Sequence, residues 1–158
     1  MNRISNKSLF ITIVAAAILY VFISMYTSNR EQMKREIIST SNAPAAIGPY
    51  NQAVLANGTL YCSGQIAINP ATNELVMGSI EEEMHQVMSN IKAVLKAANM
   101  GLSNVVKVSI FMASMEDYAA INSVYAEYFS ENAPAREAVA VKTLPKNVNV
   151  EISVIAVE

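Results

Sequence analysis

The chain of 158 residues has no tryptophan, one cysteine and one histidine. A single cysteine, Cys62, excludes a disulfide within the chain. The only histidine, His85, has no cysteine, aspartate or second histidine near it in the sequence, so no metal site is indicated. Any chemistry is therefore expected from other polar side chains.

Positive charge is scarce in most of the chain. Residues 42–158 carry six basic and eleven acidic side chains, a net charge of −5, whereas residues 1–41 carry five basic and two acidic, a net charge of +3. A nucleic-acid surface needs clustered lysine and arginine, which residues 42–158 lack. We expect one compact domain there, with no nucleic-acid partner.

Residues 9–26 contain no charged side chain. A helix of this length spans about 27 Å, close to the hydrocarbon thickness of a bilayer. We expect a basic tail at residues 1–8, a transmembrane anchor at 9–26 and a polar tether at 27–41. A cleaved signal sequence is the alternative, but Tyr26 stands where its cleavage site needs a small residue.

The orientation in the membrane is not decided by charge, because basic residues flank residues 9–26 on both sides. A short basic start followed by one apolar run is typical of an export signal. We therefore expect a single-pass, membrane-anchored protein whose domain is extracytoplasmic (periplasmic). A cytoplasmic domain is the alternative.

Residues 42–158 show the pattern of a mixed α and β domain. Two apolar segments, 50–56 and 60–68, flank Asn57-Gly58, a strong hairpin signal. Apolar residues at helical spacing predict helices at about 80–98 and 117–129, with a strand at 105–113 between them. Two further strands follow. We expect an α+β fold of order ββαβαββ, a mixed sheet with both helices on one face, plus the N-terminal transmembrane helix.

The last two strands, 136–143 and 148–157, are expected to form a hairpin about Leu144-Pro145-Lys146. Alternation of side chains then places Arg136, Ala138 and Glu151 on the same non-core face. In one chain Arg136 would lie ~13 Å from Glu151, too far for an ion pair. Either the two ions are unrelated, or a second subunit covers this face and brings its own Arg136 to Glu151.

Several separate motifs carry a family resemblance. They are APAAIGPYNQA (43–53), SGQI (63–66), PAR (134–136), LPK (144–146) and VEI (150–152). With these motifs the chain resembles the reactive intermediate deaminase (Rid, or YjgF) family over essentially all of residues 42–158. The N-terminal segment lies outside the resemblance.

The resemblance implies a chorismate-mutase-like fold, a homotrimer with clefts between subunits, and no metal or organic cofactor. It implies hydrolysis of 2-imino or enamine acids, of the 2-iminobutanoate or 2-iminopropanoate type, to 2-keto acids and ammonia. By position, Arg136 matches the arginine that binds the substrate carboxylate, and Glu151 matches the acid that orients or activates water. Tyr50, Ser63 and Asn122 match other polar residues of the cleft.

This chemistry suits the residue types. A planar guanidinium holds a carboxylate in two parallel hydrogen bonds, and a carboxylate can accept a proton from water that adds to a C=N carbon. The chain departs from the family at Ala138, where many relatives have cysteine. We expect this difference to affect substrate preference more than the reaction class, because the backbone at this position can still contact the substrate. The alternative is a trimer at the membrane that binds small carboxylates without turnover.

Overall fold

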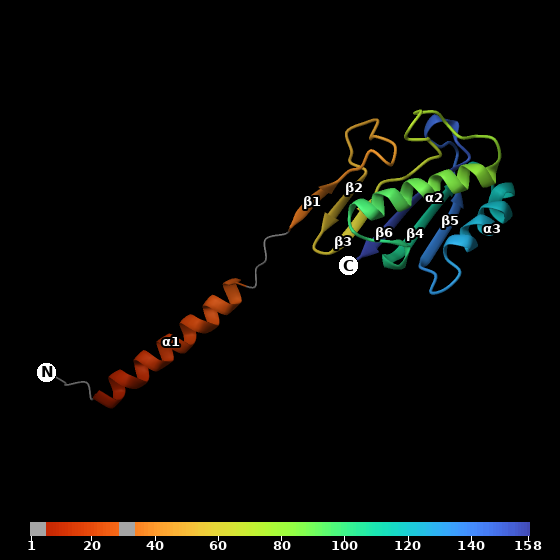
Figure 1. Ribbon diagram of the computed structural model, residues 1–158. Helices are drawn as coiled ribbons and strands as arrows, with labels where there is room; N and C mark the ends of the chain where they lie inside the picture. Colours follow the sequence, from red (N-terminus) through yellow and green to blue (C-terminus); the bar gives the residue numbers. More distant parts are fainter. Residues whose placement is uncertain (1–5, 29–33) are drawn as a thin grey trace. The chain divides into compact units, whose positions relative to one another are not determined.

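The computed structural model describes residues 6–28 and 34–158. The chain divides into two compact units, Met1–Lys34 and Arg35–Glu158, and Figure 1 labels their elements. In the first unit, helix α1 covers Asn6–Ser28. All strands of the structure belong to the second unit, which also holds the candidate site.

Helix α1 does not support the predicted membrane anchor. Within residues 6–28 and 34–158, no helix is both long enough and apolar enough to cross a bilayer. A crossing takes about 20 consecutive apolar residues, and the uncharged run in the sequence, residues 9–26, has 18. The expectation of a single-pass, membrane-anchored protein with an extracytoplasmic domain is therefore wrong. Parts of the expected basic tail and tether, residues 1–5 and 29–33, lie outside the described residues.

The second unit is built on a six-stranded sheet of order β1-β2-β3-β6-β4-β5. Strands β4 and β5 are parallel, and the other neighbouring pairs are antiparallel, so the prediction of a mixed sheet is confirmed. The predicted hairpin at Asn57-Gly58 joins β2 to β3, and both turn residues have positive φ, 49° and 76°, as a two-residue turn of this kind requires. The strands are β1 (Arg35–Ile38), β2 (Ala53–Ala56), β3 (Thr59–Cys62), β4 (Val105–Met112), β5 (Ala135–Ala140) and β6 (Val150–Val157).

Strand β1 was not expected, because its residues fall within the predicted tether. It pairs antiparallel with β2, from Arg35 opposite Ala56 to Ile38 opposite Ala53. Of its four side chains, only Ile38 is buried, so the alternation that signals a strand is too short to stand out from the charged residues before it. The observed order of this unit is thus βββαβαββ.

The predicted hairpin between the last two strands is wrong. Strand β6 lies between β3 and β4, while β5 pairs in parallel with β4 at the edge of the sheet. The connection contains a short 3₁₀ turn at Pro145–Asn147, and it carries the chain across β4 rather than reversing it tightly. This change of partner also changes which face each side chain of β5 occupies.

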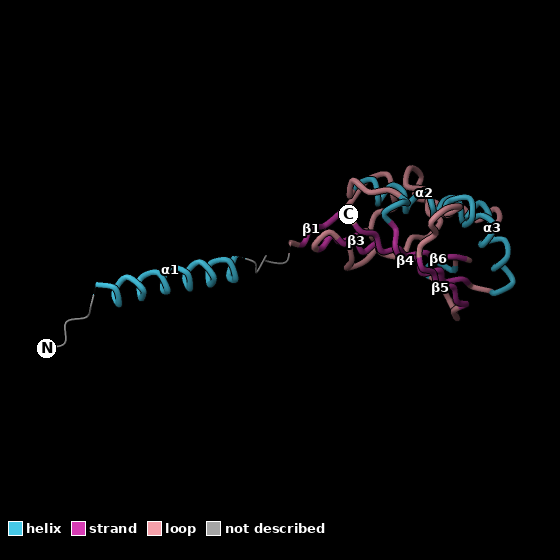
Figure 2. The backbone as a smooth tube through the Cα atoms, turned by 90° about the horizontal axis from the view of Figure 1, so that it is seen from below, coloured by secondary structure: helices cyan, strands magenta, loops and turns pink. Residues whose placement is uncertain are grey.

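Two helices cover one face of the sheet, as Figures 1 and 2 show. Helix α2 (Ile80–Ala97) begins at the N-cap Ser79, whose hydroxyl accepts from the Glu82 amide, with three glutamates in the first turn. Helix α3 is Tyr118–Tyr128. Both helices bury apolar side chains against alternate residues of β4 and β6, including Val108, Ile110, Met112, Val150, Ile152 and Val154. The expectation of an α+β domain with two helices on one sheet face is confirmed.

The other side of the sheet, here termed the open face, carries the intervening side chains. Tyr61 and Val139 are exposed on it, and Lys107 and Glu137 form an ion pair there with an N–O distance of 2.7 Å. Its residues are Tyr61, Lys107, Ser109, Phe111, Glu137, Val139, Glu151, Ser153 and Ile155, as given by the strand registers.

Candidate functional site

Glu151 and Gly64 are brought together by a backbone bridge between β6 and the segment after β3. The Gln65 amide donates to the Ile152 carbonyl (2.8 Å), and the Ile152 amide donates to the Gln65 carbonyl (3.1 Å). The Glu151 carboxylate consequently lies against the Gly64 backbone. A Cβ at residue 64 would fall 1.8 Å from Glu151 Oε1, so only glycine allows this approach.

A pocket of about 350 Å³ opens beside this carboxylate. The Ile47, Ile66 and Pro145 side chains give it apolar walls, and Tyr50, Ser63 and Glu151 supply its polar groups. The structure thus gathers three of the residues expected at the site, Tyr50, Ser63 and Glu151, around one pocket. These residues are spread over about a hundred positions of the sequence, and they meet because β3 lies next to β6 in the sheet.

Glu151 is half-buried, and burial raises the pKa of its carboxyl group above the ordinary glutamate value. Within residues 34–158, no side chain forms a hydrogen bond or ion pair with this carboxylate. A desolvated carboxylate without a cationic partner is a stronger base than one in water, because its proton affinity is not offset by a neighbouring charge. The group is therefore suited to accept a proton from water.

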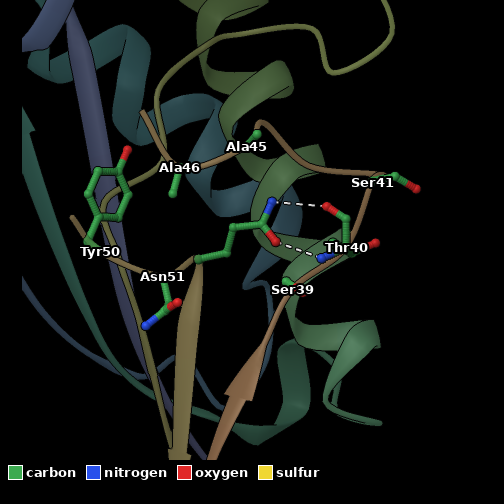
Figure 3. Close-up of a pocket in the computed structure, with 8 residues that line it drawn as sticks. Ser39, Thr40, Ser41, Ala45, Ala46, Tyr50 and Asn51 are labelled. Atoms are coloured by element: carbon green, nitrogen blue, oxygen red, sulfur yellow. Dashed lines mark hydrogen bonds between the residues drawn. The ribbon is translucent and has the colours of Figure 1, made fainter. Parts of the chain in front are cut away.

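The segment that carries Tyr50 is anchored by Gln52. Figure 3 shows Tyr50 and its neighbours at a second pocket, which is lined by residues 39–41, 45, 46 and 50–52. The buried Gln52 side chain accepts from the Thr40 amide (2.6 Å) and donates to the carbonyls of Thr40, Ala43 and Pro44. These four bonds close the loop before Tyr50. The sequence offered a signal for this role, a glutamine directly before a buried strand residue.

Ser63 is tied to the same segment. Its hydroxyl donates to the Asn51 carbonyl (2.7 Å), and its amide donates to the Gln52 carbonyl (3.0 Å). The Tyr50 hydroxyl accepts from the Ile47 amide at 3.3 Å, which leaves its own proton available to a further acceptor. Two hydroxyls are thus held at the pocket by backbone groups.

Glu83 was also missed from sequence. It is fully buried, and its carboxylate accepts from the backbone amide (3.0 Å) and the side-chain amide (2.5 Å) of Asn149, two residues before Glu151. The sequence did contain a signal for this burial. Glu83 lies four residues before Val87 and eight before Ile91, so it belongs to the buried stripe of α2.

Arg136 lies on the opposite face of the sheet from Glu151. It pairs in register with Val108, whose side chain is in the core, and it contacts helix α3. Its Nη1 donates to Asn122 Oδ1 (2.8 Å) and its Nη2 to Tyr118 Oη (3.3 Å). Asn122, which was expected among the polar residues of the cleft, thus contacts Arg136. The assignment of Arg136 to the non-core face is wrong.

Ala138 follows Arg136 on that helix-covered side, half-buried against the core, while Glu137 points to the open face and accepts from Lys107 and Ser109. The predicted faces of the β5 side chains were reversed because they were assigned from a β5–β6 hairpin that does not form. From the true registers, Arg136 and Glu151 are three residues apart along the strands and two strands apart, ~14 Å between Cα atoms. Within one chain, therefore, Arg136 and Glu151 do not meet.

Cys62 and His85 stand apart from this chemistry. Burial raises the pKa of the Cys62 thiol to about 12, so it is not a nucleophile at neutral pH. His85 Nδ1 is hydrogen-bonded to the Tyr128 hydroxyl at 2.8 Å. The described part of the chain holds no group of three or more His, Cys, Asp or Glu side chains placed to bind a metal ion.

Comparisons with known proteins agree with this architecture. A family model described as Endoribonuclease L-PSP matches residues 40–158. A RutC family protein of Pyrococcus horikoshii is 51% identical over 122 residues, 77% of this chain and 97% of that protein. The 2-iminobutanoate/2-iminopropanoate deaminase of Capra hircus is 50% identical over 124 residues, 78% of this chain and 90% of that protein. A crystal structure from Yersinia pestis, of a protein of unknown function in the conserved Rid family, has a TM-score of 0.77 and 47% identity, covering 79% of this chain and 100% of that one.

A mixed sheet with its helices on one side is the chorismate-mutase-like α+β architecture. In this chain the additional strand β1 lies at one edge of that sheet. The chain belongs to the Rid family, also called YjgF or L-PSP. The resemblance read from its motifs is confirmed.

Proposed function

We propose that this chain hydrolyses reactive 2-imino acids and their enamine tautomers, of the 2-iminobutanoate and 2-iminopropanoate type, to 2-keto acids and ammonia. The observation that carries the proposal is the Glu151 carboxylate, half-buried against Gly64 with a raised pKa and open to a pocket with apolar walls. The Capra hircus relative that bears the name of this activity supports the same reaction class.

In the proposed reaction, water adds to the C=N carbon while Glu151 accepts its proton. Glu151 passes this proton to the imine nitrogen, which gives a carbinolamine with one hydroxyl and one amino group. The hydroxyl proton then moves through Glu151 to the amino group as the C=O bond forms and the C–N bond breaks, so that the nitrogen leaves as ammonia. Each turnover consumes one water and returns Glu151 to the carboxylate. An imine carbon is already electrophilic, so orientation of the two reactants supplies much of the remaining assistance.

Substrate binding is assigned to residues around Arg136 and around Glu151. Arg136 would hold the substrate carboxylate with Asn122 at its side, and the small Ala138 would leave the neighbouring backbone accessible. Tyr50 and Ser63 would contact the polar end of the substrate beside Glu151. No metal or organic cofactor enters this scheme.

The site is proposed to form between chains of a homotrimer. Arg136 lies on the edge strand β5, and Glu151 lies on the open face, on an inner strand, so a second chain seated on the open face can present its edge to the pocket. Exposed Tyr61 (51%) and Val139 (45%) on this face supply apolar area for such a contact. Three copies related by rotation close without leaving a free edge, and light scattering should then give three times 17.1 kDa, about 51 kDa.

The test is release of ammonia and keto acid from 2-iminobutanoate generated in situ. The full-length protein should accelerate hydrolysis over buffer, and Arg136→Ala and Glu151→Ala should each remove most of the acceleration. Failure of the wild-type protein to exceed buffer would refute the proposal. Binding of 2-oxobutanoate without turnover would instead identify a carboxylate-binding module.

The family-model description also names an endoribonuclease. Against this, residues 42–158 carry a net charge of −5, which disfavours association with a phosphate backbone. Cleavage of single-stranded RNA by the wild-type protein, lost in Glu151→Gln, would favour the ribonuclease over the deaminase.

A further inference from the structure

Three residues of α3 surround the Arg136 side chain. Tyr118, Asn122 and Tyr125 are spaced by four and then three residues, so they lie on one face of the helix. Asn122 and Tyr118 accept from Nη1 and Nη2, at 2.8 and 3.3 Å, and the guanidinium carbon lies 4.6 Å from the centroid of the Tyr125 ring. One helix thus holds both terminal nitrogens and one flat face of the guanidinium.

All three partners are neutral. Within residues 34–158, no carboxylate lies within ion-pair distance of Arg136. The chain therefore fixes the cation without compensating its charge. Of the five N–H groups of a guanidinium, two donate to α3, which leaves three for an anion.

Tyr125 contributes its ring rather than its hydroxyl. The side chain is 5% exposed, and its hydroxyl is buried without a hydrogen-bond partner in the described part of the chain. Such a hydroxyl costs free energy. The ring, in contrast, stacks on Arg136 and packs against Phe129, with ring centroids 4.7 Å apart.

We propose that Tyr118 and Tyr125 are positioning residues that fix the plane of the Arg136 guanidinium for a substrate carboxylate. This inference rests on the proposed function, in which Arg136 binds that carboxylate. A guanidinium held in advance loses less conformational freedom when the anion arrives. Because the carboxylate keeps its charge throughout the reaction, the effect belongs to binding, and it should change KM rather than kcat.

Tyr118→Phe tests the hydrogen bond without changing the ring. In the full-length protein, the Kd of 2-oxobutanoate and the KM for 2-iminobutanoate should both rise about 3- to 10-fold, with kcat within twofold of wild type. Binding of 2-oxobutanamide, which lacks the carboxylate, should not change. Tyr128→Phe is the matched control, because it removes a hydroxyl from the same helix that bonds His85 rather than Arg136.

Two variants of Tyr125 separate its ring from its hydroxyl. Tyr125→Phe should keep wild-type Kd and KM, because only the unpartnered hydroxyl is lost, whereas Tyr125→Leu should raise both. Should Tyr125→Leu fail to fold, the Tyr118 comparison decides alone.

The proposal is overturned if Tyr118→Phe and Tyr128→Phe behave alike, or if Tyr118→Phe lowers only kcat or thermal stability. It is also overturned if the wild-type protein does not bind 2-oxobutanoate. If the wild-type protein binds 2-oxobutanoate, with the predicted loss in Tyr118→Phe, but releases no ammonia from the imine, the proposed function fails and the positioning role stands.

Discussion

Replacement of Gly64 by alanine tests the geometry of Glu151 directly. The added Cβ would lie 1.8 Å from Oε1, 2.7 Å from Cδ and 2.9 Å from Cγ of Glu151, where real contacts need at least 3.0 Å. The carboxylate must therefore move by about 1.2 Å or more, which requires a new side-chain rotamer. A displacement of this size in a catalytic group costs on the order of 100-fold in rate. We expect kcat for 2-iminobutanoate to fall by about that factor.

The same substitution should leave the fold intact. Gly64 is not at a positive φ, and the atoms it meets belong to a partly exposed side chain, so the free energy of unfolding should change by less than about 1 kcal/mol. Gly101→Ala is the matched control, because a Cβ there meets nothing within 4 Å. Wild-type kcat in a folded Gly64→Ala protein would refute the catalytic placement of Glu151.

Three further expectations follow from buried groups. Glu151→Gln should remove activity yet raise Tm at neutral pH. Burial raises the Glu151 pKa, so the charged carboxylate destabilises the folded state above that raised pKa. The Tm advantage of Glu151→Gln should therefore shrink as the pH falls through the raised pKa, and it should be gone below the ordinary glutamate pKa. A Tm difference that stays the same from neutral pH to below the ordinary glutamate pKa would contradict this expectation. Gln52→Leu loses four hydrogen bonds and should lower the free energy of unfolding by about 2–3 kcal/mol in urea titrations, whereas a loss below 0.5 kcal/mol would show that water replaces them. Cys62, with a thiol pKa of about 12, should resist iodoacetamide at pH 8 until the protein is unfolded, as followed by mass spectrometry.

Local patterns in the sequence predicted local structure well. The Asn57-Gly58 turn and helix α2 were predictable because a two-residue turn and an amphipathic helix are specified by neighbouring residues. The motif resemblance also named the residues that meet at the pocket, Tyr50, Ser63 and Glu151.

The pairing of β5 was not predictable in the same way. Strands β5 and β6 follow each other along the chain, and a proline turn between them is typical of a hairpin, but β4 intervenes. The order of strands in a sheet depends on contacts between residues that are far apart in the sequence, and these contacts cannot be read from the residues next to a turn. Because β5 pairs with β4 and not with β6, Arg136 lies on the helix-covered face, and the predicted arrangement of the site was wrong.

An uncharged run of eighteen residues, 9–26, suggested a membrane helix that the structure does not support.

The most direct measurement mixes two inactive proteins. Arg136→Ala and Glu151→Ala are unfolded together in equal amounts, refolded, and assayed with 2-iminobutanoate. If each site takes its arginine from one chain and its acid from the next, random assembly gives about one quarter of the sites both groups, and about one quarter of wild-type activity should return. If both groups act within one chain, or if the enzyme is monomeric, the mixture will stay as inactive as its components.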